Sequence, residues 1–178
     1  MDKYKMIFSG SGGQGVITAA IILAEAAVLH EDLFAVQSQS YGPEARGGST
    51  RSDVIISSSK INYPKVMNPS VLVCLTQESY RKFSHLIIPG GTVITDSRFV
   101  TPGKTSDAIL KELDMYDAVM EKIGNPIVLN MCMLGAVIHI TQIIKPASLF
   151  KIIEARMPGK FVEMNKEAIE IGIGLASK

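Results

Sequence analysis

Residues 9–20, SGSGGQGVITAA, place four glycines directly in front of an apolar segment. Gly10, Gly12 and Gly15 fit the spacing GxGxxG, and Gly13 adds a further position without a side chain. A tight turn needs residues that tolerate positive φ, and a phosphate approaches the backbone closely only where no Cβ intervenes. The N–H groups that begin the following helix would face the anion. The spacing predicts a phosphate-binding turn, and a glycine turn that serves packing alone is the alternative.

A second polar segment, SQSYGPEARGGSTRSD (38–53), is rich in turn-forming residues. Loops of this length within a compact domain are usually functional or disordered. Its residues with chemical groups or special backbone properties are Tyr41, Gly42, Pro43, Glu44, Arg46, Gly47, Gly48 and Arg51. Arg46 suits a phosphate or carboxylate as well as an ion pair with Glu44, and Tyr41 suits packing or a partner contact better than acid–base chemistry. In an open α/β sheet this segment would leave the second strand beside the glycine turn, so we expect both to line one crevice.

Several common sites are not supported. NAD binding calls for an acidic residue at the end of the second strand, where this chain has Gln37, Ser38 and Gln39. No GKS or GKT follows the glycines, as an ATP-binding P-loop requires, and there is no GxSxG motif. We therefore expect no catalytic residue of its own on this chain.

Metal chemistry is equally unsupported. His30, His85 and His139 are too far apart in sequence for ligand spacing. Cys74 and Cys132 lie in apolar stretches outside any CxxC pair, so we expect buried, reduced thiols and no metal site.

The elements around these motifs alternate between strand and helix patterns. The predicted strands cover 3–9, 34–38, 51–57, 71–75, 92–97 and 126–130, and the predicted helices cover 16–29, 78–86, 106–123, 131–144, 147–157 and 162–176. Such alternation is typical of a three-layer, doubly wound α/β fold of the Rossmann-like kind, with a mainly parallel sheet and helices on both faces. One domain spanning residues 1–178 is expected from the length.

Composition narrows the class of protein. The chain is 47% apolar and 20% charged, which is typical of a folded globular protein. A formal net charge of +1 gives no broad attraction for nucleic acid or an anionic membrane. The N-terminal apolar run is too short for a signal peptide, and residues 123–144 carry no charge but are interrupted by polar residues, so we expect a cytoplasmic protein without a membrane span.

Taken together, GSGGQGV (10–16) and SYGPEARGGSTRSDVIIS (40–57) resemble the gamma subunit of the 2-oxoacid:ferredoxin oxidoreductases. The resemblance continues through PGGTVITDS (89–97) and NMCMLGAVIHIT (130–141), so it covers nearly the whole chain. It implies one subunit of an oxygen-sensitive enzyme of anaerobic metabolism. That enzyme converts a 2-oxoacid, coenzyme A and oxidised ferredoxin to acyl-CoA, carbon dioxide and reduced ferredoxin, with 2-oxoglutarate or pyruvate as the expected oxoacid.

The resemblance also implies where cofactors and partners lie. Thiamine diphosphate, Mg²⁺ and iron–sulfur clusters would sit on the partner subunits, which are alpha, beta and, in some members, delta, and ferredoxin would act through the complex. The isolated chain could form a homodimer. Two alternatives remain open: a non-catalytic module that docks subunits through residues 41–48, and a stand-alone nucleotide-binding oxidoreductase.

On this chain the resemblance implies a contribution to the coenzyme A site. The expected binding residues are Gly10, Ser11, Gly12, Gly13, Gln14, Gly15, Arg46 and Asn130. The turn would hold the pyrophosphate through main-chain N–H groups, with side-chain donors from Ser11 and Gln14. Arg46 would hold a further phosphate or shape the entry. Asn130 would make a polar contact or serve as a helix N-cap.

Overall fold

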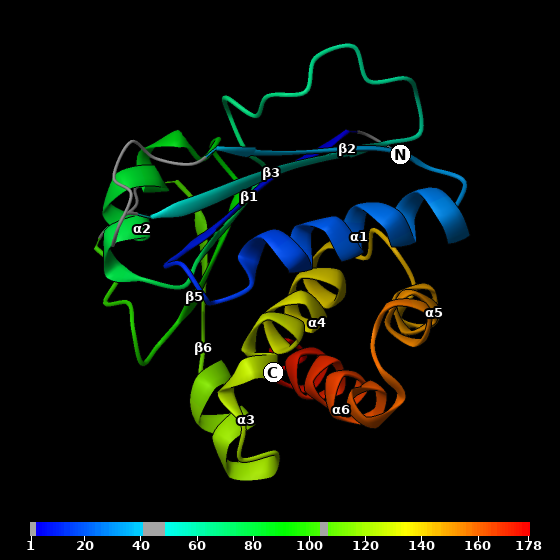
Figure 1. Ribbon diagram of the computed structural model, residues 1–178. Coiled ribbons are helices and arrows are strands. Elements are labelled where there is room, and N and C mark those ends of the chain that lie inside the picture. The colour runs from blue at the N-terminus through cyan, green and yellow to red at the C-terminus, as the bar shows by residue number, and fades with distance from the viewer. Residues whose placement is uncertain (1–2, 41–48, 104–106) are drawn as a thin grey trace.

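The computed structural model describes residues 3–40, 49–103 and 107–178 as one six-stranded sheet with helices on both faces (Figure 1). The strands are β1 (Tyr4–Gly10), β2 (Phe34–Ser40), β3 (Thr50–Ser57), β4 (Val71–Cys74), β5 (Thr92–Asp96) and β6 (Ile109–Leu113). The helices are α1 (Val16–His30), α2 (Gln77–Phe83), α3 (Met115–Lys122), α4 (Leu129–Thr141), α5 (Pro146–Arg156) and α6 (Gly159–Ala176). Short 3₁₀ helices cover Ser84–Leu86 and Pro126–Val128.

The sheet has the strand order β2-β3-β1-β4-β5-β6. The strands β1, β4, β5 and β6 are parallel, whereas β3 is antiparallel to both β1 and β2. The mainly parallel α/β fold expected from the sequence is confirmed, with one antiparallel strand between β1 and β2. The carboxyl ends of β1 and β2 therefore lie at the same edge of the sheet, but the two strands are not neighbours.

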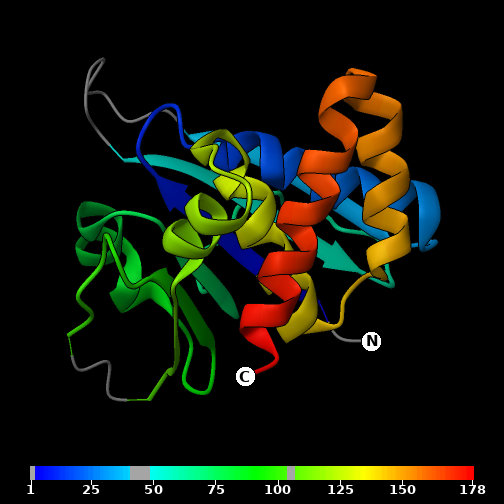
Figure 2. The same ribbon diagram turned by 90° about the horizontal axis from the view of Figure 1, so that it is seen from below.

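Alternating side chains of the central strands enter two separate cores. Met6 and Phe8 of β1 pack beneath α1, α3, α4, α5 and α6, whereas Ile7 packs with Tyr80 and Phe83 of α2. This period of two is expected for a strand that is covered on both faces. Figure 2 shows α4, α5 and α6 together in front of the sheet. The second face has a thinner cover, made of α2, the 3₁₀ helix Ser84–Leu86 and connecting segments.

The strand predicted at 126–130 is wrong. The side chain of Asn125 accepts a hydrogen bond from the N–H of Ile127, and Pro126 occupies the first position of the 3₁₀ helix. Both are helix-starting features, because proline fits the first turn and asparagine caps it. The apolar residues that follow therefore continue into α4, and a short apolar run alone does not distinguish strand from helix.

The helix predicted at 106–123 is wrong in its first half. Residues Ile109–Leu113 form β6, which pairs in parallel with β5 from Thr92 to Asp96, and the helix α3 begins only at Met115. Lys111 and Glu112 gave this segment a helix-like composition, but pairing with β5 decides its conformation. In the three described ranges, no helix combines the length and apolarity needed to cross a membrane.

Candidate functional site

The glycine turn joins β1 to α1 at the carboxyl edge of the sheet. Gly15 is the N-cap residue of α1, with φ 70° and ψ 19°. The helix has no side-chain cap and no acidic residue in its first turn. The N–H groups of that turn are therefore free to bind an anion, and the positive end of the helix dipole lies beside them.

A hollow of about 430 Å³ lies in front of this helix start. Its lining consists of Ser11, Gly12, Gly13, Gly15, Val16, Ile17, Thr18 and Thr50. Small side chains and main chain thus form most of its wall. Thr50 belongs to β3, stands opposite Gly10 in the sheet register, and its carbonyl accepts a hydrogen bond of 2.9 Å from the Ser9 hydroxyl. The arrangement can hold an anion through main-chain donors, and none of its described lining residues carries a carboxylate that would repel the anion.

The glycines of the turn serve different purposes. Gly13 and Gly15 have φ values of 90° and 70°, which other residues rarely adopt. Gly12 lies outside that region, and a Cβ at Gly12 would meet nothing within 4 Å. The fold therefore does not require glycine at position 12, and the absence of a side chain there keeps the hollow open.

Gln14 braces the turn, which differs from the role predicted for it. Its Oε1 accepts the N–H of Ser11 at 2.7 Å, and its Nε2 donates to the carbonyl of Leu75 at 3.3 Å. The side chain that we expected to donate to a ligand is thus engaged in the protein, and the Ser11 N–H is engaged with it. The first turn of α1 still offers main-chain donors to a ligand, and Ser11 still lines the hollow.

The side chain of Asn130 contacts the glycine turn without lining the hollow. It is the second residue of α4, whose N-cap is Val128, so the N-cap alternative is wrong. Its Nδ2 donates to the carbonyl of Gly15 at 3.2 Å, and the residue is buried. Asn130 is not among the residues that line the hollow. In the structure Asn130 bonds to the turn, and its contact with coenzyme A stays a prediction.

The residues predicted in the second segment, Tyr41, Gly42, Pro43, Glu44, Arg46, Gly47 and Gly48, lie outside the described residues. The described ends of this segment can be placed. Ser40 pairs with Arg51, next to the pair of Thr50 with Gly10, so both ends lie at the sheet edge that carries the glycine turn. The strand next to β1 at this edge is β3, whereas the sequence suggested β2.

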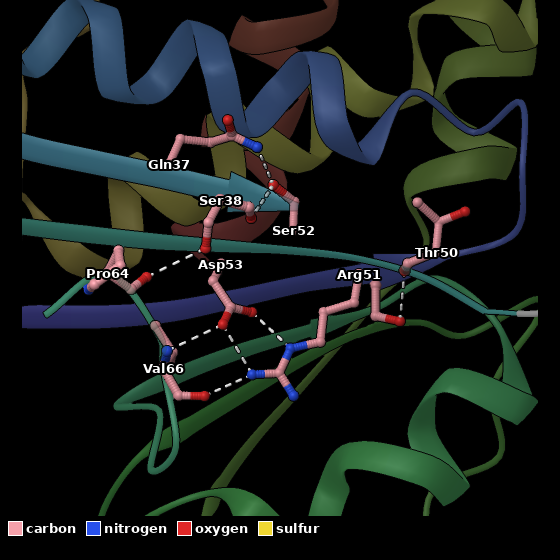
Figure 3. A network of polar contacts seen from close by, with 9 residues as sticks. Gln37, Ser38, Thr50, Arg51, Ser52, Asp53, Pro64 and Val66 are labelled. Carbon is pink, nitrogen blue, oxygen red and sulfur yellow. Dashed lines mark hydrogen bonds and ion pairs between the residues drawn. The ribbon is translucent and has the colours of Figure 1, made fainter. Parts of the chain in front are cut away.

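Sequence reasoning missed an ion pair at the start of β3. Arg51 and Asp53 are two residues apart on one strand, so their side chains share a face. The Arg51 Nε lies 2.6 Å from Asp53 Oδ1, and Nη2 lies 2.9 Å from Oδ2 (Figure 3). The sequence signal was the i, i+2 spacing of opposite charges within a strand pattern.

The two thiols do not form a reactive or metal-binding site. Cys74 packs in the core beneath α2 and Cys132 in the core beneath α1, on opposite faces of the sheet. Burial raises the pKa of each thiol to about 12, so both remain protonated at neutral pH. Over the described ranges, no group of three or more histidine, cysteine, aspartate or glutamate residues could hold a metal ion.

A buried carboxylate, Asp96, ends β5 at the same sheet edge. Burial raises the pKa of Asp96 above its ordinary value. The N–H donors of Tyr116 at 2.8 Å and Arg98 at 3.0 Å offset only part of this rise. The bond from Tyr116 attaches the end of β5 to the first turn of α3. The residue does not line the glycine hollow, so its contacts are structural.

The sheet order also argues against a dinucleotide site. In dinucleotide-binding folds the strand that carries the acidic ribose ligand lies directly beside β1. Here β3 separates the two, and Gln37 of β2 donates a hydrogen bond of 2.8 Å to the Ser52 hydroxyl. The missing acidic residue and the inserted strand both disfavour NAD.

Comparison with known proteins gives consistent results over nearly the whole chain. The 2-oxoglutarate synthase subunit KorC of Methanocaldococcus jannaschii is 41% identical over 172 residues, which are 96% of this chain and 92% of the relative. The crystal structure of a keto/oxoacid ferredoxin oxidoreductase gamma subunit from Geobacter sulfurreducens has a TM-score of 0.91 at 36% identity and covers 99% of this chain and 98% of that chain.

A more distant structure shares the fold. The 2-oxoglutarate:ferredoxin oxidoreductase of Magnetococcus marinus, solved with 2-oxoglutarate, coenzyme A and succinyl-CoA bound, has a TM-score of 0.86 at 20% identity. The match covers 99% of this chain but 31% of that longer chain. Residues 5–175 match the family described as pyruvate ferredoxin/flavodoxin oxidoreductase. The resemblance found in the sequence is confirmed: the chain belongs to this family, as a gamma subunit of 2-oxoacid:ferredoxin oxidoreductase complexes.

Proposed function

We propose that this gamma subunit binds the diphosphate of coenzyme A in the glycine hollow and that its complex oxidises 2-oxoglutarate. The complex would convert 2-oxoglutarate, coenzyme A and oxidised ferredoxin to succinyl-CoA, carbon dioxide and reduced ferredoxin. The observation that carries the proposal is the uncapped start of α1, with three first-turn residues, Val16, Ile17 and Thr18, lining a hollow whose described lining includes no carboxylate. A diphosphate suits such a site because its oxygens accept several main-chain hydrogen bonds at once.

The role of this subunit is to position a substrate. When bound on partner subunits, thiamine diphosphate with Mg²⁺ would supply the carbon chemistry and iron–sulfur clusters the electron transfer. An iron–sulfur cluster does not fit the described part of this chain, whose two cysteines are buried on opposite faces of the sheet and which has no group of three or more histidine, cysteine, aspartate or glutamate residues that could hold a metal ion. Holding the coenzyme A diphosphate fixes one end of the molecule and limits where its thiol can reach. Such orientation can lower a barrier by several kcal/mol.

The choice of 2-oxoglutarate rests on relatives. The Methanocaldococcus jannaschii relative is a 2-oxoglutarate synthase subunit, and the Magnetococcus marinus enzyme was solved with 2-oxoglutarate and succinyl-CoA. The complex should therefore be purified with its alpha, beta and any delta subunits and assayed for ferredoxin reduction with each oxoacid. A higher kcat/KM for pyruvate than for 2-oxoglutarate would overturn this part of the proposal.

The coenzyme A site can be tested with Gly12→Val. A Cβ at position 12 meets nothing within 4 Å, so the fold should persist while valine narrows the hollow. We expect the KM for coenzyme A to rise by about tenfold or more, with decarboxylation of the oxoacid unchanged. The matched control is Gly174→Val on α6, where a Cβ also meets nothing within 4 Å.

The main alternative is that the turn is architectural and that residues 41–48 only dock partner subunits. In that case Gly12→Val would leave the coenzyme A dependence of an assembled complex unchanged. Calorimetry with coenzyme A on the wild-type complex and on Arg46→Ala complements this test. An unchanged affinity would indicate that Arg46 holds no phosphate of the ligand.

A further inference from the structure

A network of polar contacts holds the segment 64–66 against β3 (Figure 3). Arg51 binds Asp53 through two parallel hydrogen bonds, and its Nη2 also donates to the carbonyl of Val66 at 2.5 Å. Asp53 Oδ2 accepts the N–H of Val66 at 3.0 Å. The ion pair therefore satisfies both main-chain groups of Val66, as a neighbouring strand would do.

The same pair connects further segments of the molecule. The Arg51 guanidinium lies 5.4 Å from the centre of the Phe83 ring of α2. Ser38 of β2 donates a hydrogen bond of 3.2 Å to the carbonyl of Pro64. Three residues, Ser38, Arg51 and Asp53, thus attach segment 64–66 to the β2–β3 pair, and Arg51 also packs against α2.

The contacts are strong because they are shielded from water. The side chain of Asp53 is 9% exposed and that of Arg51 is 20% exposed. A two-bond arginine–carboxylate pair fixes geometry, and removing one partner leaves the other charge partly buried. Lysine cannot replace the planar fork of arginine at such a site.

Arg51 lies next to a wall of the glycine hollow. It follows Thr50, which lines the hollow and stands opposite Gly10. The Arg51 side chain packs over Phe83 in the core beneath α2, whereas α1 covers the other face of the sheet. Arg51 therefore does not line the hollow itself, and it can affect the hollow only through the position of its own main chain.

We propose that Arg51 and Asp53 are positioning residues for the coenzyme A site, which fix the start of β3 so that Thr50 forms one wall of the glycine hollow. The proposal rests on the proposed function of that hollow. In this proposal Arg51 does not bind a phosphate of the ligand. An arginine in a polar, glycine-rich segment could serve either as a phosphate ligand or as a positioning residue, and the structure favours the second role. The pair acts on the wall of the site, and the first turn of α1 supplies the donors.

The test compares Arg51→Lys and Asp53→Asn in the assembled complex. We expect the KM for coenzyme A to rise about fivefold or more, with kcat and oxoacid decarboxylation changed less than about twofold. Asp53→Asn is nearly isosteric and keeps an acceptor for Val66, so it serves if Arg51→Lys does not assemble. An unchanged KM for coenzyme A in an assembled variant would overturn the proposal. An equal fall in kcat/KM for coenzyme A and for the oxoacid would overturn it too.

Arg98→Lys is the matched control. Arg98 also pairs with a carboxylate, Asp117 at 2.7 Å, and its guanidinium lies 4.8 Å from the centre of the Tyr116 ring. It follows β5, which β4 separates from β1 and its glycine turn in the sheet. We expect no change in the KM for coenzyme A.

Hydrogen exchange separates a failure of this proposal from a failure of the proposed function. In Arg51→Lys, the amides of 49–53, Lys65 and Val66 should exchange faster, whatever ligand the hollow binds. Unchanged exchange there would contradict the positioning role directly. If Gly12→Val leaves the coenzyme A dependence unchanged, the proposed ligand is wrong instead.

Discussion

The side-chain amide of Asn130 donates a hydrogen bond to the carbonyl of Gly15, a residue 115 positions earlier in the sequence. Gly15 is the left-handed N-cap of α1, and Asn130 belongs to the most deeply buried helix, α4. The core of the protein thus holds the end of the glycine turn. The Gly15 carbonyl also accepts the N–H of Ala19 at 3.0 Å, so it keeps a partner if Asn130 is replaced.

Gly15→Ala should destabilise the protein by about 2 kcal/mol or more. Alanine would have to adopt φ 70°, and its Cβ would lie 2.5 Å from Asn130 Nδ2. Asn130→Ala alone should lower stability by about 1 kcal/mol, the usual contribution of one hydrogen bond. Urea unfolding of the full chain measures both values.

The double variant tests the contact between these residues. With Asn130 shortened to alanine, the closest clash is removed and mainly the backbone strain remains, so Gly15→Ala should become milder by about 1 kcal/mol. Strictly additive free energies would show that the two side chains do not interact. Gly12→Ala is the control, because a Cβ there meets nothing within 4 Å.

A second prediction concerns the crossing of α4 and α6. A Cβ at Gly172 would lie 1.8 Å from the carbonyl oxygen of Cys132, and one at Gly135 would lie 2.1 Å from that of Ile169. Because both obstacles are main-chain atoms, the helices would have to separate. Gly172→Ala should therefore destabilise the protein by about 3 kcal/mol.

The control for this crossing lies on the same helix. Gly174 is exposed, and a Cβ there meets nothing within 4 Å. Gly174→Ala should be neutral or stabilise by up to about 1 kcal/mol, because alanine favours the helix. Equal thermal unfolding midpoints for the Gly172 and Gly174 variants would show that the crossing is not close.

The local parts of this fold were predictable from sequence. The glycine turn, the apolar strand at 71–75 and the start of α1 each depend on neighbouring residues, and the structure places all three as expected. The polar edge strand β6 was not predictable, because its conformation depends on pairing with β5. The insertion of β3 between β1 and β2 has the same cause, since chain order suggests neighbours that only tertiary pairing can decide.

The candidate site shows the same division. Glycine spacing predicted the turn at 10–15, because left-handed backbone and close approach both call for glycine. The spacing did not show that Gln14 bonds to Leu75, or that Asn130 bonds to Gly15, because those partners come from distant parts of the sequence. Side-chain roles in the site therefore had to come from the structure.

The last prediction concerns pH and the contact between α1 and α5. Glu31, which follows α1, accepts hydrogen bonds from the N–H of Lys145 at 2.8 Å and from the Ser148 hydroxyl at 2.6 Å, and so attaches the end of α1 to the start of α5. Burial is the largest single influence and raises the Glu31 pKa. The hydrogen bonds from Ser148 and Lys145, with the charges of Lys145 and His30, outweigh it and hold the pKa below its ordinary value of 4.5.

A carboxylate with a lowered pKa stabilises the folded state above its ordinary pKa, and this stabilisation is lost as the pH falls through the folded-state value. Glu31→Gln should therefore lower the free energy of unfolding at pH 7 by about 1 kcal/mol, the usual contribution of one hydrogen bond. The difference from wild type should shrink as the pH falls below 4.5. Urea unfolding across this range tests it, with Glu170→Gln on the exposed side of α6 as the control. A difference that stays constant with pH would show that the Glu31 charge contributes nothing to the contact between α1 and α5.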